Sequence, residues 1–256
     1  MRKDEMLLTS NYLGRDMNVR IYGSCEGYPI LVFPTQNAMA NQFEEFGMIE
    51  TLADFIDEGL VQLFCVDSVD ADGWTSSSED PEHRSEIIEA YYHFVVDELL
   101  DEIHDYTTTE LLPITMGCAL GASHAAIMFL RRPELFQACI CLSGIYDASY
   151  YFGGWMNGIL YENSPVHFLG NMPEDHEYVD IYNNRDMVFC VGQGAWEDNA
   201  VNSLHSIEES FRRLGVEAWC DWWGFDVSHD WYWWKKQARY FLPIVLDGIA
   251  EKLRGA

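Results

Sequence analysis

Residues 112–136 read LPITMGCALGASHAAIMFLRRPELF, and this stretch decides the fold. A short apolar run comes first, a turn bounded by two glycines follows, and an apolar, alanine-rich segment continues from the turn. The pattern predicts a strand over 112–117 that runs through a sharp turn into a helix over 120–131. Glycine is needed at Gly117 and Gly121 because side chains there would collide with the neighbouring strand and helix.

The two glycines flank Ala119 with the spacing of the nucleophile elbow G-x-S-x-G, which has a serine at the centre of the turn. This chain has an alanine there instead. Such a turn alone is equally compatible with tight packing and no chemistry, because small residues occur at many strand-to-helix turns. Two further features favour the elbow. Ala122, Ala125 and Ala126 allow close helix packing, and an acid and a histidine follow in the order typical of α/β-hydrolases.

Outside this stretch, apolar runs alternate with amphipathic segments. Near-continuous apolar strands separated by helices predict an α/β fold with a mostly parallel sheet covered on both faces. The 256 residues suffice for a single domain over 1–256. A cap-like insert is expected at about 147–180, where aromatics, glycine and asparagine break the alternation. The other predicted strands are 18–22, 29–34, 61–67, 138–143, 186–192 and 217–223, and the other predicted helices are 42–57, 81–105, 199–214 and 232–253.

Composition narrows the class of partner. The net charge of -27 argues against nucleic acid and against anionic membrane surfaces. No apolar run reaches the length of a transmembrane helix, and the polar start MRKDEMLLTSNY does not resemble a signal peptide. The seven cysteines fit neither a disulfide framework nor a zinc site, and most lie in apolar runs. We therefore expect reduced, buried thiols and a cytoplasmic protein.

The stretch at 112–136 resembles the esterase D-like family of α/β-hydrolases, which includes feruloyl and acetyl esterases, S-formylglutathione hydrolases and mycolyltransferases. The family elbow typically reads G-x-S-x-G-(G/A)-x-x-A and is followed by R-x-P-(D/E)-L-F; this chain has GCALGASHA and RRPELF. The resemblance extends to PTQNAMANQFEEFGMIE, LFCVDSVDADGW, GQGAWED and SHDWYWW. It implies an α/β-hydrolase fold and a serine esterase, a carboxylic-ester hydrolase acting through a catalytic triad of serine, histidine and acid.

The acid of such a triad follows a late strand, and the histidine lies before the last helix. Glu197 and Asp198 both follow the strand at 186–192, and only one of them can point at the histidine. We favour Glu197, because Asp198 suits the cap of the helix that begins there. His229 opens the sequence HDWYWW, and the resemblance implies that it is the general base and then the general acid. Capping or packing is the alternative for each.

An oxyanion hole requires two N–H donors aimed at the developing charge. The first should be the main-chain N–H of Leu120, and the resemblance places the second at Gln36 or Asn37, in the loop after the strand at 29–34. A plain solvated turn is the alternative for that loop. Three tryptophans are positioned to line a groove for an aryl or sugar ester, although each is equally compatible with the core: Trp74, Trp155 and Trp196. His124, which is five residues past Ala119, is expected to pack or to support the site.

Without a serine hydroxyl, only the oxyanion hole and binding would accelerate hydrolysis, by roughly 10³–10⁴-fold over water. We therefore expect the chain to bind an ester far better than it cleaves one. An inactive mutant engineered to trap substrate and a natural pseudoenzyme both explain Ala119; we favour the mutant, because the rest of the triad is intact. An acyltransferase is a further alternative. We expect a small-molecule ester as partner and neither a cofactor nor a metal; homo-oligomer formation stays open.

Overall fold

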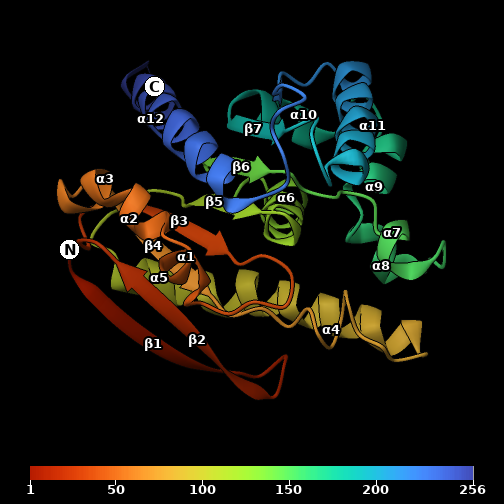
Figure 1. The fold of residues 1–256 in the computed structure, drawn as a ribbon, viewed down its shortest axis with the longest axis horizontal. Helices are drawn as coiled ribbons and strands as arrows, with labels where there is room; N and C mark the ends of the chain where they lie inside the picture. The colour runs from red at the N-terminus through yellow and green to blue at the C-terminus, as the bar shows by residue number, and fades with distance from the viewer. Residues whose placement is uncertain (256) are drawn as a thin grey trace.

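Within residues 1–255, which the computed structural model describes, an eight-stranded sheet has the order β1-β2-β4-β3-β5-β6-β7-β8 (Figure 1). Strand β1 pairs antiparallel with β2, and β2 pairs antiparallel with β4; all other neighbours are parallel. The predicted mostly parallel sheet is confirmed. The strands are β1 (Lys3–Ser10), β2 (Arg15–Tyr22), β3 (Tyr28–Phe33), β4 (Val61–Val66), β5 (Ile114–Cys118), β6 (Ala138–Leu142), β7 (Asp186–Val191) and β8 (Trp219–Trp222).

Helices cover both faces of the sheet and bury an apolar core on each side. One core packs the sheet against α4 (Pro81–His93), η1 (Phe94–Leu99), α6 (Leu120–Arg131) and α11 (Asp198–Leu214). The other packs it against α2 (Met48–Thr51), α3 (Ala53–Asp57) and α12 (Trp231–Gly255). Figure 1 shows α12 and α4 on opposite sides of the sheet. The remaining helices of these regions are α1 (Gln42–Glu45) and α5 (Leu100–Tyr106). No helix in residues 1–255 combines the length and apolar character that crossing a bilayer requires.

Local chemistry explains where the elements differ from the sequence predictions. The Asp80 carboxylate accepts hydrogen bonds from main-chain N–H groups in the first turn of α4 and so caps that helix. The predicted helix at 81–105 contains a π-helical segment, η1, between α4 and α5. The prediction of a single helix at 42–57 is wrong: Gly47, with a φ of 75°, separates α1 from α2, and Leu52 separates α2 from α3. Strand β1 was not predicted; it is a largely exposed edge strand without a clear apolar pattern.

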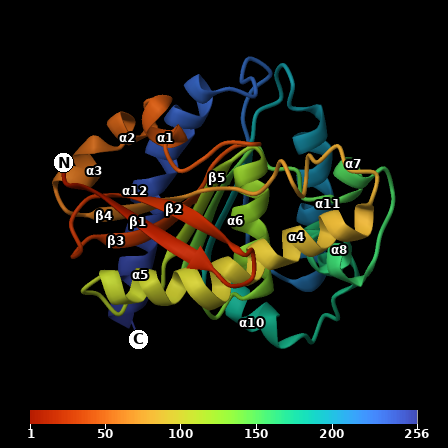
Figure 2. The same ribbon diagram turned by 90° about the horizontal axis from the view of Figure 1, so that it is seen from below.

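The segment 147–180, predicted as a cap-like insert, lies in the connection from β6 to β7. It contains short helices: α7 (Ser149–Phe152), α8 (Gly158–Glu162), α9 (Pro165–Asn171) and the start of α10 (Glu177–Asn183). Figure 2 shows α7 and α8 beside one end of α4. The Asn157 amide donates a hydrogen bond to the Ser85 hydroxyl of α4 at 3.1 Å. This arrangement places α7 near the carboxyl ends of the central strands, where ligands bind in open α/β sheets.

Candidate active site

The turn between β5 and α6 is built around Ala119. This residue has φ 52° and ψ -124°, a conformation that L-residues rarely adopt, and its N–H donates to the Leu142 carbonyl at 2.9 Å. A Cβ atom at Gly117 would overlap the backbone of Gly121, and one at Gly121 would overlap the carbonyl of Phe33. The two glycines therefore allow the close approach that the sequence predicts, and Ala119 is presented at the carboxyl end of the sheet.

His229 and Glu197 meet beside this turn. The Nδ1 atom of His229 lies 2.9 Å from Oε2 of Glu197. The Glu197 side chain is 1% exposed and that of His229 is 24% exposed. A carboxylate at Nδ1 fixes the imidazole orientation and leaves Nε2 for proton transfer. Asp198 is exposed and is the first residue of α11, so of the two acids it is Glu197 that contacts the histidine.

Two loops bring the acid and the histidine together. One loop follows β7 and carries Glu197; the other follows β8 and carries His229. The Gly194 N–H donates to the Val227 carbonyl at 2.8 Å, and the His229 N–H donates to the Ala195 carbonyl at 3.0 Å. A Cβ atom at Gly194 would lie 2.7 Å from the Val227 carbonyl oxygen, so this approach requires glycine. These contacts hold the two loops against each other.

Ser143 holds the other oxygen of the acid. This residue directly follows β6; its hydroxyl donates to Oε1 of Glu197 at 2.6 Å and accepts from the indole N–H of Trp234 at 3.0 Å. The ring of Trp234 also lies edge-on to His229, with the ring centroids 4.8 Å apart. Both carboxylate oxygens of Glu197 therefore have partners, which offsets the cost of burying a charge.

The candidate oxyanion-hole donors are the main-chain N–H groups of Leu120 and Gln36, two residues that line the same cavity as Ala119. Leu120 begins α6, and its N–H belongs to the first helical turn, which has no partner within the helix. Neither it nor the N–H of Gln36 has a hydrogen-bond acceptor within residues 1–255. In contrast, the N–H of Asn37 donates to Oδ2 of Asp70 at 3.2 Å. Of the two loop residues proposed as second donor, Gln36 is therefore the one with a free N–H.

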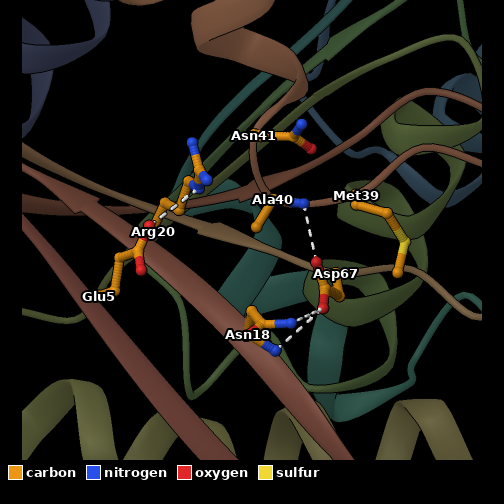
Figure 3. A pocket seen from close by; sticks show the side chains of 7 residues that line it. All are labelled: Glu5, Asn18, Arg20, Met39, Ala40, Asn41 and Asp67. Carbon is orange, nitrogen blue, oxygen red and sulfur yellow. Dashed lines mark hydrogen bonds and ion pairs between the residues drawn. The ribbon is translucent and has the colours of Figure 1, made fainter.

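Two buried aspartates anchor the loop that carries Gln36. Asp70 contacts Asn37 as described, and its Oδ1 atom lies 2.7 Å from Nε2 of His124, which is the supporting contact of that histidine. Asp67 accepts from the Ala40 N–H at 2.9 Å and from Asn18 (Figure 3). The cavity of about 260 Å³ next to Asp67 is lined by none of the predicted site residues. Asp67 therefore contributes to the site by anchoring this loop through Ala40.

A separate cavity of about 130 Å³ lies over Ala119. The expected histidine and both residues with free N–H groups line it, together with side chains from the connection after β6 and from α11. A neighbouring cavity of about 300 Å³ shares Ile145, Tyr150 and Asn199 with it, so the two adjoin. The lining residues of the first cavity are Gln36, Ala119, Leu120, Ser143, Ile145, Tyr150, Tyr151, Trp196, Asn199, Ala200 and His229.

The three tryptophans predicted to flank the opening lie in different environments. Trp196 lines the cavity and is 86% exposed. Trp74 is 3% exposed and packs edge-on against Tyr151, so it lies behind the cavity wall. Trp155 is half-buried and stacks on Phe152 in α7, outside the lining residues. Only Trp196 of the three therefore lies at the opening.

Backbone strain is concentrated at this site. Within residues 1–255, four residues other than glycine have a positive φ: Asn37, Ala119, Ser143 and Trp196, with values from 52° to 68°. Three of them line the cavity, and Asn37 adjoins the lining residue Gln36. Each such conformation costs on the order of 1–3 kcal/mol, and strain of this kind clusters at functional sites. The strained residues come from four separate loops, and their meeting around one cavity identifies it as the candidate site.

Sequence reasoning missed Ser143, Tyr150 and the contact of Asp70 with Asn37. Ser143 had a usable signal, because it ends the run at 138–143 and neighbouring parallel strands end at the same edge of the sheet. Tyr150 had none, since nothing in the aperiodic segment 147–180 indicates which aromatic faces the cavity.

Burial raises the pKa of Tyr151, so that phenol stays protonated near neutral pH.

The strand order, the strained turn after β5 and the adjoining histidine–acid pair define an α/β-hydrolase fold. The chain belongs to the family described as "Putative esterase", whose model matches residues 10–239. No curated protein sequence matches it.

Several solved structures share the fold at low sequence identity. A ferulic acid esterase aligns with a TM-score of 0.75 at 14% identity, covering 96% of this chain and 98% of its own. The S-formylglutathione hydrolase of Agrobacterium tumefaciens aligns with a TM-score of 0.72 at 12% identity, covering 96% of this chain and 95% of its own. A ferulic acid esterase of Anaeromyces mucronatus in complex with ferulic acid aligns with a TM-score of 0.70 at 11% identity, covering 97% of this chain and 92% of its own.

Proposed function

We propose that this chain binds a carboxylic ester over Ala119, in a serine-esterase site whose nucleophile position lacks a hydroxyl. In this proposal His229 and Glu197 are the other two members of the triad, and the N–H groups of Leu120 and Gln36 form the oxyanion hole. The observation that carries it is the His229–Glu197 hydrogen bond of 2.9 Å beside a cavity that Ala119 lines. Membership of an esterase family supports the reaction class.

The backbone strain and the partial burial of Ala119 support binding rather than a packed turn. Ala119 is half-buried and lines a cavity, whereas a turn with no chemistry would be covered by side chains. The arrangement has the groups that a serine esterase needs except the serine oxygen. Both carboxylate oxygens of Glu197 have partners, the imidazole of His229 is oriented, and two N–H donors are free. Covalent catalysis needs an attacking oxygen, and a methyl group has none. The chain would therefore hold an ester without forming an acyl-enzyme.

The opening favours a small ester with an aromatic or sugar group. The exposed Trp196 and Tyr150 offer ring faces at the cavity, and Asn199 offers an amide. Aromatic faces stack on aryl rings and on the apolar faces of sugars. The segment 147–180, which contributes Tyr150, acts as the cap in this proposal. An acyltransferase would use the same site if an acceptor alcohol displaced water, and esterase assays with added alcohols would reveal it.

Restoring the hydroxyl tests the proposal. Ala119→Ser should create activity on a short-chain aryl ester, orders of magnitude above the unmodified chain, because the base, acid and donors are in place. The matched control is Ala250→Ser, which adds a hydroxyl at an exposed position of α12 and should leave the rate unchanged. If a folded Ala119→Ser protein stays inert over a broad ester panel, Ala119 does not come from a mutation engineered to trap substrate. That result would favour a natural pseudoenzyme.

A further inference from the structure

No side chain at the site is available to replace a serine nucleophile. Among the residues that line the cavity, Ser143 is the only serine, threonine or cysteine, and its hydroxyl is committed to Glu197 and Trp234. Ser123 is buried in α6, where its hydroxyl donates to the Ile145 carbonyl at 2.6 Å. Burial raises the pKa of the Cys118 thiol, which keeps it protonated and weakly nucleophilic. Water is therefore the nucleophile that the site can use.

The cavity has room for water next to the imidazole. Its volume of about 130 Å³ exceeds the room that a single water molecule needs. His229 lines this cavity while its Nδ1 atom is held by Glu197, so Nε2 is the ring nitrogen left for a water molecule. The buried carboxylate stabilises the imidazolium that proton uptake would create. General-base catalysis of this kind contributes about 10²–10⁴-fold.

We propose that this chain hydrolyses small activated esters directly, with His229 deprotonating a water molecule over the Ala119 methyl group. The proposal rests on the ester-binding function above. The water oxygen bonds to the carbonyl carbon, and one water proton moves to Nε2 of His229. The carbonyl oxygen becomes the oxyanion, held by the N–H groups of Leu120 and Gln36. The bond to the leaving alcohol then breaks, and the imidazolium returns the proton to the alcohol. Acid and alcohol leave, and no bond to the protein forms.

The methyl group limits which esters react by this route. Non-bonded heavy atoms stay about 3.5 Å apart, whereas a serine oxygen is bonded to its Cβ. The attacking water therefore stands further from residue 119 than a serine oxygen would, and the carbonyl must shift outward. A small acyl group with a good leaving group tolerates that shift best. Ala119→Gly should speed the direct route, because it removes the methyl group and relieves the positive φ.

The experiment measures hydrolysis of 4-nitrophenyl acetate by the full chain. His229→Ala should lower kcat/KM by about 10²-fold or more. His229→Gln is the second variant, because it retains a polar side chain if alanine disturbs folding. His104→Ala is the matched control; its side chain is 60% exposed on α5, and the rate should be unchanged. Rapid quenching and intact-mass measurement should detect an acetyl adduct on the Ala119→Ser variant and none on the unmodified chain.

Each alternative result has a distinct meaning. Equal rates for the unmodified chain and both folded His229 variants would overturn the water route, as would an acetyl adduct on the unmodified chain. Ester binding by NMR with no turnover would also overturn it, while the ester-binding function would stand. An inert Ala119→Ser variant together with no detectable ester binding would defeat the proposed function itself.

Discussion

At the scale of single residues, the site maintains strained conformations that the fold alone does not need. Trp196 is the clearest case: a bulky residue at φ 68° with its ring 86% exposed. Neither burial nor packing compensates for that conformation. A residue with an intrinsic cost of this kind persists when its side chain is used, and stacking on a bound ester is the use that the proposed site offers.

Two substitutions at Trp196 separate the strain from the ring. Glycine tolerates a positive φ and alanine does not, so Trp196→Gly should have a free energy of unfolding about 1 kcal/mol higher than Trp196→Ala. Both variants lose the ring. In the Ala119→Ser background, both should therefore raise KM for an aryl ester by a similar factor. Urea unfolding and steady-state kinetics measure the two effects. A KM unchanged in both variants would remove Trp196 from the binding surface.

The two adjacent acids should differ sharply in an active background. With Ala119→Ser present, Glu197→Gln should lower kcat by about 10²- to 10⁴-fold, because it removes the charge that orients the imidazole and stabilises its protonated form. Asp198→Asn is the matched control and should stay within about threefold of its parent, since Asp198 is exposed at the start of α11. Equal small losses in both variants would mean that the acid of the site is another residue.

Ser143 should act through Glu197. In the same Ala119→Ser background, Ser143→Ala removes one hydrogen bond to a buried carboxylate, a contribution of about 1.5–3 kcal/mol. We expect kcat to fall by about tenfold or more while KM for an aryl ester changes little, because Ser143 acts on the acid. A loss confined to KM would instead assign Ser143 to substrate contact.

At the scale of elements, a partly buried ion pair ties together α6, α4 and the end of α8, at the opposite end of α6 from Ala119. Arg131 at the end of α6 donates to Glu89 of α4 and to the Asn163 amide oxygen after α8. Its guanidinium also lies 3.5 Å from the ring centroid of Tyr92. Burial opposes ionisation of Glu89, but the hydrogen bonds and charge of Arg131 outweigh it, so the pKa of Glu89 lies below its ordinary value. The pair connects the segment 147–180 to the body of the fold.

This lowered pKa predicts a pH dependence of stability. The contribution of the Glu89 carboxylate is complete above the unfolded-state pKa of about 4.3 and is lost as pH falls through the lower folded-state value. Glu89→Gln should therefore destabilise the chain at neutral pH and flatten the decline in unfolding free energy below about pH 4.3. The matched control is Glu86→Gln, also on α4, whose side chain is 60% exposed. Urea unfolding at a series of pH values measures this. If the unfolding free energy of both variants fell at acid pH as steeply as that of the unmodified chain, the prediction would be wrong.

Elements with strong local signals could be predicted from the sequence. The runs that became β3 to β7 are mostly apolar, and α4 has its cap in Asp80. Strand β1 could not be predicted, because it depends on pairing with β2 and leaves most of its side chains exposed. The breaks between α1, α2 and α3 were also missed, because helical periodicity does not report the backbone conformations of Gly47 and Leu52.

At the scale of the whole molecule, the site is assembled from chain segments far apart in sequence. The sequence order of elbow, acid and histidine indicated their meeting, since parallel strands bring their carboxyl ends together. The position of Trp74 could not be found that way. Its burial depends on His124, Tyr151 and Phe152, which only the finished fold brings around it. Local patterns therefore indicated which residues of the proposed triad would meet, but not which residues would wall the cavity.

The most direct test of the central claim is a structure of the unmodified chain with an intact aryl ester. We predict that the ester carbonyl carbon lies within about 4 Å of the Ala119 Cβ atom. Its carbonyl oxygen should lie within about 3.2 Å of the main-chain nitrogens of Leu120 and Gln36, with the aryl ring against Trp196. An ester bound elsewhere, or bound in this cavity with its carbonyl turned away from both nitrogens, would contradict the account.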